Sequence, residues 1–74
     1  IEKTILYPNP ASNELFFSKS INEILLFDIT GQLLYSQKGI IDRVDLTQFD
    51  NGIYFLNLSH SDGFIQREKL IITK

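Results

Sequence analysis

Turn-forming residues recur along this chain every 8 to 12 residues, and this spacing restricts the fold more than any other feature. The turn clusters lie at 8–10, 18–20, 30–31, 38–39, 50–52 and 61–63. The segments between them are rich in Ile, Leu, Phe, Tyr and Val, which favour strands. They predict seven strands, at 3–7, 13–17, 23–28, 33–37, 43–46, 53–59 and 64–73. Short strands at this spacing are typical of an all-β sandwich or barrel.

One segment also carries a helix signal. Residues 20–23 fit the Ser-x-x-Glu capping box and apolar residues follow at helical spacing, so a helix over 21–29 is conceivable. Asp28 would then lie on the apolar face of a short helix, in a segment where β-branched and aromatic residues are frequent. We therefore favour a strand there.

The last predicted strand has an ambiguous pattern. Leu70 and Ile72 alternate onto one face together with Gln66 and Glu68. Either the first half of this strand lies beyond the core, or a bulge changes its register. In the strand before it, Phe55 falls on the face opposite the apolar alternation and is expected to be either partly exposed or covered at an edge.

Length and composition exclude several classes of protein. Seventy-four residues describe one domain, over 1–74. The absence of cysteine removes disulfides and thiolate nucleophiles. A net charge of −2 without a basic stripe disfavours nucleic acid as a partner, and no apolar run is long enough to span a membrane. The start at Ile1 has neither Met nor a signal peptide, so we expect a piece of a longer chain.

Residues with catalytic or metal-binding chemistry are few. His60 is the only histidine, and beside a turn it is expected to be a solvated loop residue. No nucleophile–base pairing is visible, so we predict no enzyme activity and no cofactor. Asp42, Asp45 and Asp50 are close enough in sequence to share a calcium ion, although turn formation explains them better.

Aromatic residues suggest a possible binding surface. Phe16, Phe55, Phe64 and Tyr35 can form an exposed patch, although packing is favoured in so small a domain. With the three aspartates, they motivate an alternative function, a non-catalytic immunoglobulin-like module that adheres or binds a ligand.

Short motifs follow one another along the whole chain. They are Tyr7-Pro8-Asn9-Pro10, Asn13-Glu14-Leu15, Leu26-Phe27-Asp28-Ile29-Thr30-Gly31, Leu46, Gly52-Ile53-Tyr54-Phe55 and Lys69-Leu70-Ile71-Ile72-Thr73-Lys74. In this order they resemble the carboxyl-terminal sorting domain of the type IX (Por) secretion system of Bacteroidota. We therefore expect a small immunoglobulin-like antiparallel β-sandwich of about seven strands.

Several motif residues have a predicted structural role of their own. Pro8 and Pro10 fix φ and are expected to hold the chain extended between two strands. Gly31 can adopt a positive φ in a tight turn between antiparallel strands, and Gly52 can do likewise. Tyr54 is expected to anchor the core with its hydroxyl at the rim.

The resemblance implies a sorting signal and not an enzyme. Members of this family direct a cargo, joined N-terminally in the same precursor, through an outer-membrane translocon with shuttle components. A sortase-like cysteine protease at the cell surface then commonly removes the domain, upstream of the first strand. The expected location is the periplasm in transit, then the cell surface or the medium.

The resemblance also places recognition at the carboxyl-terminal end, which corresponds to residues 63–74. The candidate contacts for the translocon are Gly63, Arg67, Lys69, Leu70, Ile72 and Lys74. A terminal strand with unpaired edge groups can dock by strand addition.

Overall fold

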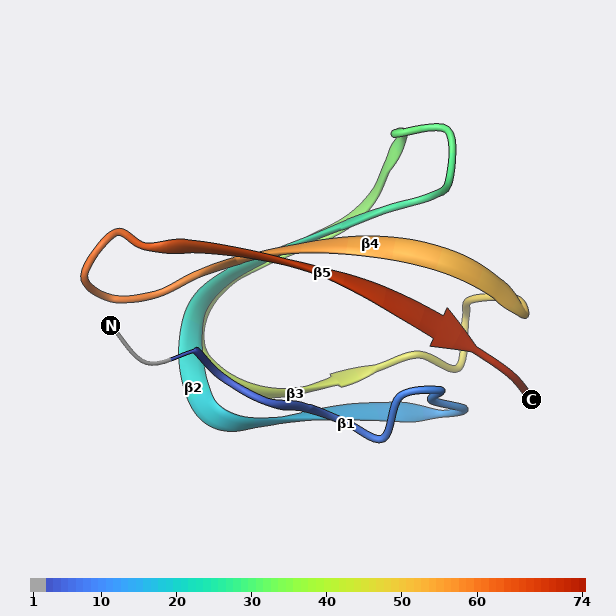
Figure 1. Ribbon diagram of the computed structural model, residues 1–74, viewed down its shortest axis with the longest axis horizontal. Helices are drawn as coiled ribbons and strands as arrows, with labels where there is room; N and C mark the ends of the chain where they lie inside the picture. Colours follow the sequence, from blue (N-terminus) through green and yellow to red (C-terminus); the bar gives the residue numbers. More distant parts are fainter. Residues whose placement is uncertain (1–2) are drawn as a thin grey trace.

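All regular elements of the described chain are strands, and all pairings between these strands are antiparallel (Figure 1). The structure is a computed structural model that describes residues 3–74. Its strands are β1 (Leu6–Tyr7), β2 (Glu14–Phe27), β3 (Leu33–Asp45), β4 (Gly52–Ser59) and β5 (Ile65–Ile72). The predicted all-β class is therefore confirmed. Among the described residues, no helix is long and apolar enough to cross a membrane.

The strands form one curled five-stranded sheet, a half-barrel, in place of the expected seven-stranded immunoglobulin-like sandwich. The first half of β2 pairs with β1 and the second half with β4, while β3 follows the opposite edge of β2. β5 completes the sheet beside β4. In Figure 1 the long strands β2 and β3 curve around the concave side, which encloses the core.

Two predicted turns are wrong, because the chain bends there without reversing. Residues 18–20 lie within β2 and residues 38–39 lie within β3. The pairing of these strands shifts register between Phe16 and Ile21 and again between Ile21 and Glu23. Extra residues therefore bulge out of the ladder and bend both strands. Four predicted strands are in fact the halves of β2 and β3.

The bulged segment of β2 stays extended because its backbone finds other partners. The N–H of Ser18 donates to the carbonyl oxygen of Ile5 at 2.9 Å. The hydroxyl of Thr4 accepts from the N–H of Lys19 and donates to the Lys19 carbonyl, both at 2.9 Å. These bonds replace the ladder that is lost at the bulge, so a polar sequence continues as a strand.

The helix considered over 21–29 is not formed. Most of this segment belongs to β2, and its backbone pairs along both edges, with β3 and with β4. Ile24 and Leu26 are buried on the concave side, while Leu25 and Phe27 are half-buried on the convex side. Hydrogen bonds to two neighbours and this two-sided packing outweigh the local capping signal.

The core fills the concave side of the sheet. Its buried residues are Ala11, Leu15, Phe17, Ile21, Ile24, Leu26, Ile41, Val44, Leu46, Phe49, Tyr54, Leu56, Leu58, Leu70 and Ile72. The ring of Tyr54 packs edge-on against Phe49, and its hydroxyl donates to the carbonyl oxygen of Asp50 at 2.7 Å. The expected role of Tyr54, a core anchor with its hydroxyl at the rim, is confirmed.

Turn chemistry is confirmed at one predicted position and corrected at two others. Gly31 has φ of 90° between β2 and β3, as expected. Gly52 also has a positive φ, of 158°, but it does not lie in a tight turn between paired strands, because β3 and β4 are not neighbours and residues 46–51 cross between them. The chain bends at 8–10, with cis peptide bonds before both prolines, where an extended junction was expected. This bend carries the chain from the edge of β2 to the edge of β5.

Candidate functional site

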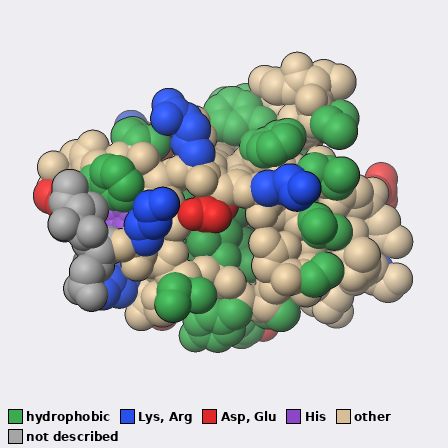
Figure 2. Space-filling view, viewed as in Figure 1, with side chains coloured by type: hydrophobic (Ala, Val, Ile, Leu, Met, Phe, Trp, Pro, Cys, Tyr) green, Lys and Arg blue, Asp and Glu red, His purple; other side chains and the backbone are tan. Residues whose placement is uncertain are grey.

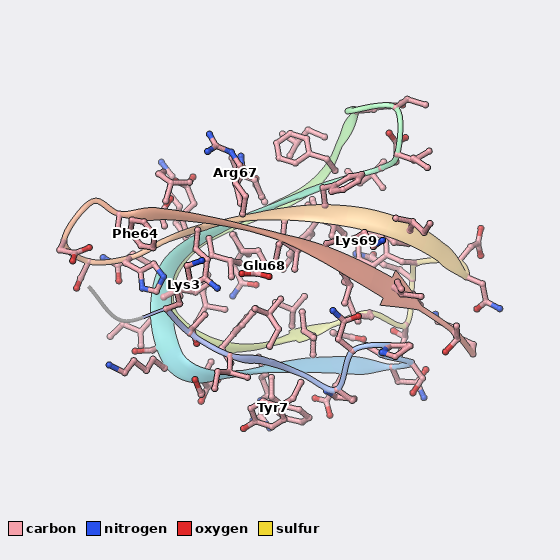
Figure 3. The ribbon with its side chains drawn as sticks, viewed as in Figure 1. Lys3, Tyr7, Phe64, Arg67, Glu68 and Lys69 are labelled. Atoms are coloured by element: carbon pink, nitrogen blue, oxygen red, sulfur yellow. The ribbon has the colours of Figure 1, made fainter. Side chains whose placement is uncertain are left out.

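The predicted contact residues of β5 divide between its two faces. Leu70 and Ile72 point into the core and are 0% and 1% exposed. Arg67 and Lys69 lie on the convex face and are exposed. Figure 3 shows Arg67 pointing away from the half-barrel, whereas Glu68 points toward its inside. Of these four residues of β5, only Arg67 and Lys69 therefore offer their side chains to a partner in the folded domain.

The two ends of the predicted recognition segment are held in place by hydrogen bonds. Gly63 has φ of 92° and donates its N–H to the carbonyl oxygen of His60 at 3.0 Å, closing the turn between β4 and β5. Lys74 donates through Nζ to the carbonyl oxygens of Leu46 and Thr47, both at 3.0 Å. Both residues thus shape the segment in this structure.

The outer edge of β5 is covered over its last half. The side-chain amide of Asn9 donates to the carbonyl oxygen of Lys69 at 3.0 Å and accepts from the N–H of Ile71 at 3.1 Å. Ala11 then forms a parallel bridge, donating to the Ile71 carbonyl and accepting from the Thr73 N–H, both at 2.8 Å. The edge proposed for strand addition is therefore already occupied here, and the Tyr-Pro-Asn-Pro motif supplies one of the occupants.

Gln66 closes the half-barrel at the other half of β5. Its side chain is 2% exposed and uses its full hydrogen-bonding capacity. Oε1 accepts from the N–H of Thr4 at 3.0 Å and lies 2.9 Å from Nε2 of His60. Nε2 donates to the carbonyl oxygen of Thr4 at 2.9 Å and to Glu68 Oε2 at 2.8 Å. One amide side chain thus pairs with the Thr4 backbone as a neighbouring strand would.

The contacts of Thr4 and Gln66 resolve the ambiguous pattern of the last strand. β4 and β5 pair in continuous register without a bulge, and Gln66 lies inside because it is fully hydrogen-bonded. Sequence reasoning did not assign a role to Gln66. The available signal was a polar residue at an inward-facing position of a strand, which requires a buried partner.

His60 is not the solvated loop residue that the sequence predicted. It is half-buried, and its ring lies 5.4 Å from that of Phe64. Since an amide oxygen only accepts, the bond to Gln66 places the proton of His60 on Nε2. His60 therefore supports the amide that holds Thr4.

Asp28 organises the turn between β2 and β3. Its Oδ1 accepts from the hydroxyl of Thr30 at 2.6 Å and from the N–H groups of Thr30 and Gln32 at 2.9 and 3.0 Å. These bonds, led by the Thr30 hydroxyl, hold the pKa of Asp28 below its ordinary value of 3.8.

We expect Asp28→Ala to destabilise the chain more at neutral pH than in acid. The folded pKa lies below the unfolded one, so the carboxylate stabilises the fold above about pH 3.8. This contribution is lost as the pH falls through the folded pKa. Urea unfolding at a series of pH values measures the difference between wild type and variant. Asp42→Ala is the control, because Asp42 accepts no hydrogen bond within residues 3–74. A difference for Asp28→Ala that does not change with pH would contradict the prediction.

The three aspartates considered for calcium do not come together. In the described part of the chain, no group of three or more acidic or imidazole side chains could hold a metal ion. Asp45 instead accepts from the N–H of Thr47 at 2.9 Å, which is turn chemistry. The hydroxyl of Thr47 adds to the effect of this bond in lowering the pKa of Asp45.

Three of the four aromatic residues considered for a binding patch pack against other rings. Phe16 stacks on Tyr7, Phe64 lies tilted against the ring of His60, and Tyr35 packs edge-on against Phe49. Phe55 is the exception, with 42% of its surface exposed.

Phe55 borders a shallow groove on the outer face of β4 and β5. The groove has a volume of about 420 Å³ and is lined by Phe55, Leu56, Asn57, Arg67, Glu68 and Lys69. Figure 2 shows basic side chains beside apolar ones over this part of the surface. An open, largely apolar groove with cations at its rim suits a partner's side chains better than a small substrate.

The chain is similar to one protein family and to short parts of much longer proteins. The family described as the secretion system C-terminal sorting domain matches residues 5–73. The chain is 27% identical over 74 residues to the beta-agarase D of Zobellia galactanivorans, covering 99% of the chain and 16% of that protein. It is 31% identical over 75 residues to an ulvan lyase of Nonlabens ulvanivorans, covering 90% of the chain and 14% of that protein.

The fold is also found within a solved structure. The chain matches part of PorZ, described as an essential bacterial surface component of the type-IX secretion system of Porphyromonas gingivalis. The TM-score is 0.70 at 15% identity, covering 96% of the chain and 11% of that protein's chain. At this identity the likeness concerns the fold alone.

Proposed function

Because the chain belongs to the family of secretion system C-terminal sorting domains, we propose that it directs a larger precursor through the outer membrane by the type IX secretion system. The observation that carries the proposal is the family match over residues 5–73, which includes all five strands. The family is one of sorting domains, so the chain acts as an address and any catalysis belongs to the cargo.

The cargo of this precursor is an exported protein that lies outside the present chain. The matched regions form 16% and 14% of the beta-agarase and the ulvan lyase, so a comparable unit accompanies large enzymes in those proteins. We propose that the precursor passes through the periplasm and that the cargo reaches the cell surface or the medium. Its partners on this route are the translocon, shuttle components of the outer membrane and a sortase-like cysteine protease that removes the domain.

The predicted recognition residues contribute to this function in different ways. Arg67 and Lys69 are proposed as direct contacts, because they are exposed on the convex face of β5. Leu70 and Ile72 support them from the core. Gly63 and Lys74 support them from the two ends of the segment. The motif residues Tyr54, Gly31 and Asn9 maintain the fold on which the signal depends.

A localisation experiment tests this function. Residues 1–74 are fused to the carboxyl terminus of a periplasmic fluorescent reporter in a Bacteroidota host, with and without a working translocon. We expect the reporter at the surface or in the medium only with both the fusion and the translocon. A fusion that lacks residues 63–74 should stay in the periplasm, since it lacks all of β5. Retention of the complete fusion in every strain would contradict the proposal and favour the adhesive-module alternative.

A further inference from the structure

The convex face of the sheet carries an apolar band that crosses four strands. Leu33 on β3 pairs with Phe27 on β2, Phe27 pairs with Phe55 on β4, and Phe55 pairs with Lys69 on β5. Phe27, Phe55 and Lys69 are in continuous register, so their side chains form one row on the same face, and Leu33 lies beside Phe27 at a register shift of β3. Leu33 is 50% exposed and Phe55 42%. The row lies on the side opposite the core.

Apolar residues on both sides of this row widen the band. On one side, Leu25 pairs with Asn57, which pairs with Arg67. On the other side, Ile53 pairs with Ile71. The outer face of a small antiparallel sheet is usually polar, with alternation of buried and solvated side chains. A contiguous apolar surface in that place is typical of an interaction site.

The band has a basic rim along β5. Arg67 and Lys69 stand two residues apart on the same face, and neither forms an ion pair with any residue of 3–74. The groove between Phe55 and these two residues gives the surface a concave part. The chain as a whole has a net charge of −2, so this positive rim is a local feature. It would attract a partner with carboxylates at the matching positions.

We propose that this outer band, together with Arg67 and Lys69, docks a protein of the transport machinery through an apolar ridge edged by carboxylates. The inference rests on the proposed function and names the surface that performs it. The apolar ridge enters the groove beside Phe55, and the carboxylates pair with the two cations. The apolar contact supplies most of the affinity, and the charges set orientation and association rate.

A second copy of the chain fits this surface less well. Glu23 is the acidic residue that β2 contributes to this end of the convex face, and it lies opposite Lys38 and Ser59, away from the row of Phe55. β4 and β5 contribute no outward carboxylate in their paired residues. Glu68 also lines the groove, but it points toward the inside of the half-barrel and accepts from Gln66, so two copies placed face to face would offer Arg67 and Lys69 few free carboxylates.

Point variants on the exported fusion test the inference. Phe55→Ser, Arg67→Glu and Lys69→Glu should each lower the rate of translocon-dependent export about tenfold, the effect of losing one interface hot spot. Arg67→Lys should retain most of the export. Ile40→Ser and Arg43→Glu are the matched controls on β3, since Ile40 is 89% exposed and Arg43 is an exposed cation outside the band. Both controls should leave export unchanged.

Measurements on the purified chain separate docking from folding. Urea unfolding should give the band variants the same denaturation midpoint as the controls, so that a loss of export reflects docking and not unfolding. If the wild-type fusion is exported and the band variants are exported at the same rate, the inference is overturned and the proposed function remains. Failure of the wild-type fusion would overturn both. If sedimentation shows a dimer and Phe55→Ser dissociates it, the band binds a second copy. If the chain binds anionic phospholipid vesicles and Lys69→Glu abolishes this binding, the band binds a lipid surface. Either result would overturn the proposal.

Discussion

Replacing Leu70 by alanine should lower the free energy of unfolding by about 2–5 kcal/mol. The side chain is fully buried in the core, so the change removes apolar contacts and leaves a cavity that the curled sheet can only partly fill. Domains of this size are stable by about 5–15 kcal/mol, so a loss in this range is a large share of the total. Urea unfolding of the complete chain, followed by circular dichroism, measures it.

Ile65→Ala is the matched control for Leu70→Ala. Ile65 lies on the same strand, but on the convex face, and it is 44% exposed. Its truncation should change stability by no more than about 0.5 kcal/mol. A similar loss for both variants would show that depth in the core does not determine the effect. If Leu70→Ala kept full stability but blocked export, Leu70 would be a direct contact with the translocon, contrary to its place in this structure.

The second large effect is expected for Gln66→Met. Methionine fills a similar volume but cannot bond to the backbone of Thr4, so a buried N–H and carbonyl lose their partners. We expect a loss of about 1–3 kcal/mol, the cost of leaving buried polar groups unsatisfied. We call the hydrogen bonds between Gln66 and the Thr4 backbone the clamp. Hydrogen exchange at the Thr4 amide should accelerate more than exchange within β4, because the clamp opens locally before the sheet unfolds.

Gln48→Met is the control for the clamp. Gln48 is exposed and forms no hydrogen bond within residues 3–74, so its replacement should leave stability and exchange unchanged. Unaltered exchange at Thr4 in Gln66→Met would mean that the Thr4 hydroxyl, bonded to Lys19 of β2, holds the segment alone. That outcome would remove Gln66 from the closure of the half-barrel.

The sequence predicted the strand class because local patterns determine it. Alternation over 53–59 identifies β4 and places Phe55 on the face away from the core, and the structure decides for partial exposure over edge coverage. The turn at Gly31 follows from the conformational freedom of glycine and from Asp28, which binds the backbone two and four residues later. Such features depend on neighbours in the chain and can be read without the tertiary structure.

The length of β2 and β3 was not predictable in the same way. Ser18 and Lys19 have the composition of a turn, yet their backbone is held by Thr4 and Ile5, more than ten residues away. Whether a polar segment reverses or only bends depends on partners that a local window does not contain. For the same reason the sequence predicted a sandwich of seven strands, whereas the structure is a half-barrel of five.

The candidate site was predicted in part for a related reason. Strand alternation places Arg67 and Lys69 on one face and Leu70 and Ile72 on the other. Which of these faces is the core depends on the curl of the sheet. The clamp between Gln66 and Thr4 joins residues that are 62 positions apart, and no spacing rule connects them. The outer band likewise depends on the register of four strands.

The junction of Thr4 with Gln66 has a consequence for the order of events during synthesis. Thr4 is synthesised before Gln66, and it can form these hydrogen bonds only after 62 further residues have been added. A precursor that stops before Gln66 lacks the clamp and the bridge to Ala11. It also lacks all of β5 except Ile65. The closed half-barrel therefore forms only after translation has passed Gln66. Everything that precedes the domain in the same chain is therefore already synthesised when the hydrogen bonds between Thr4 and Gln66 form.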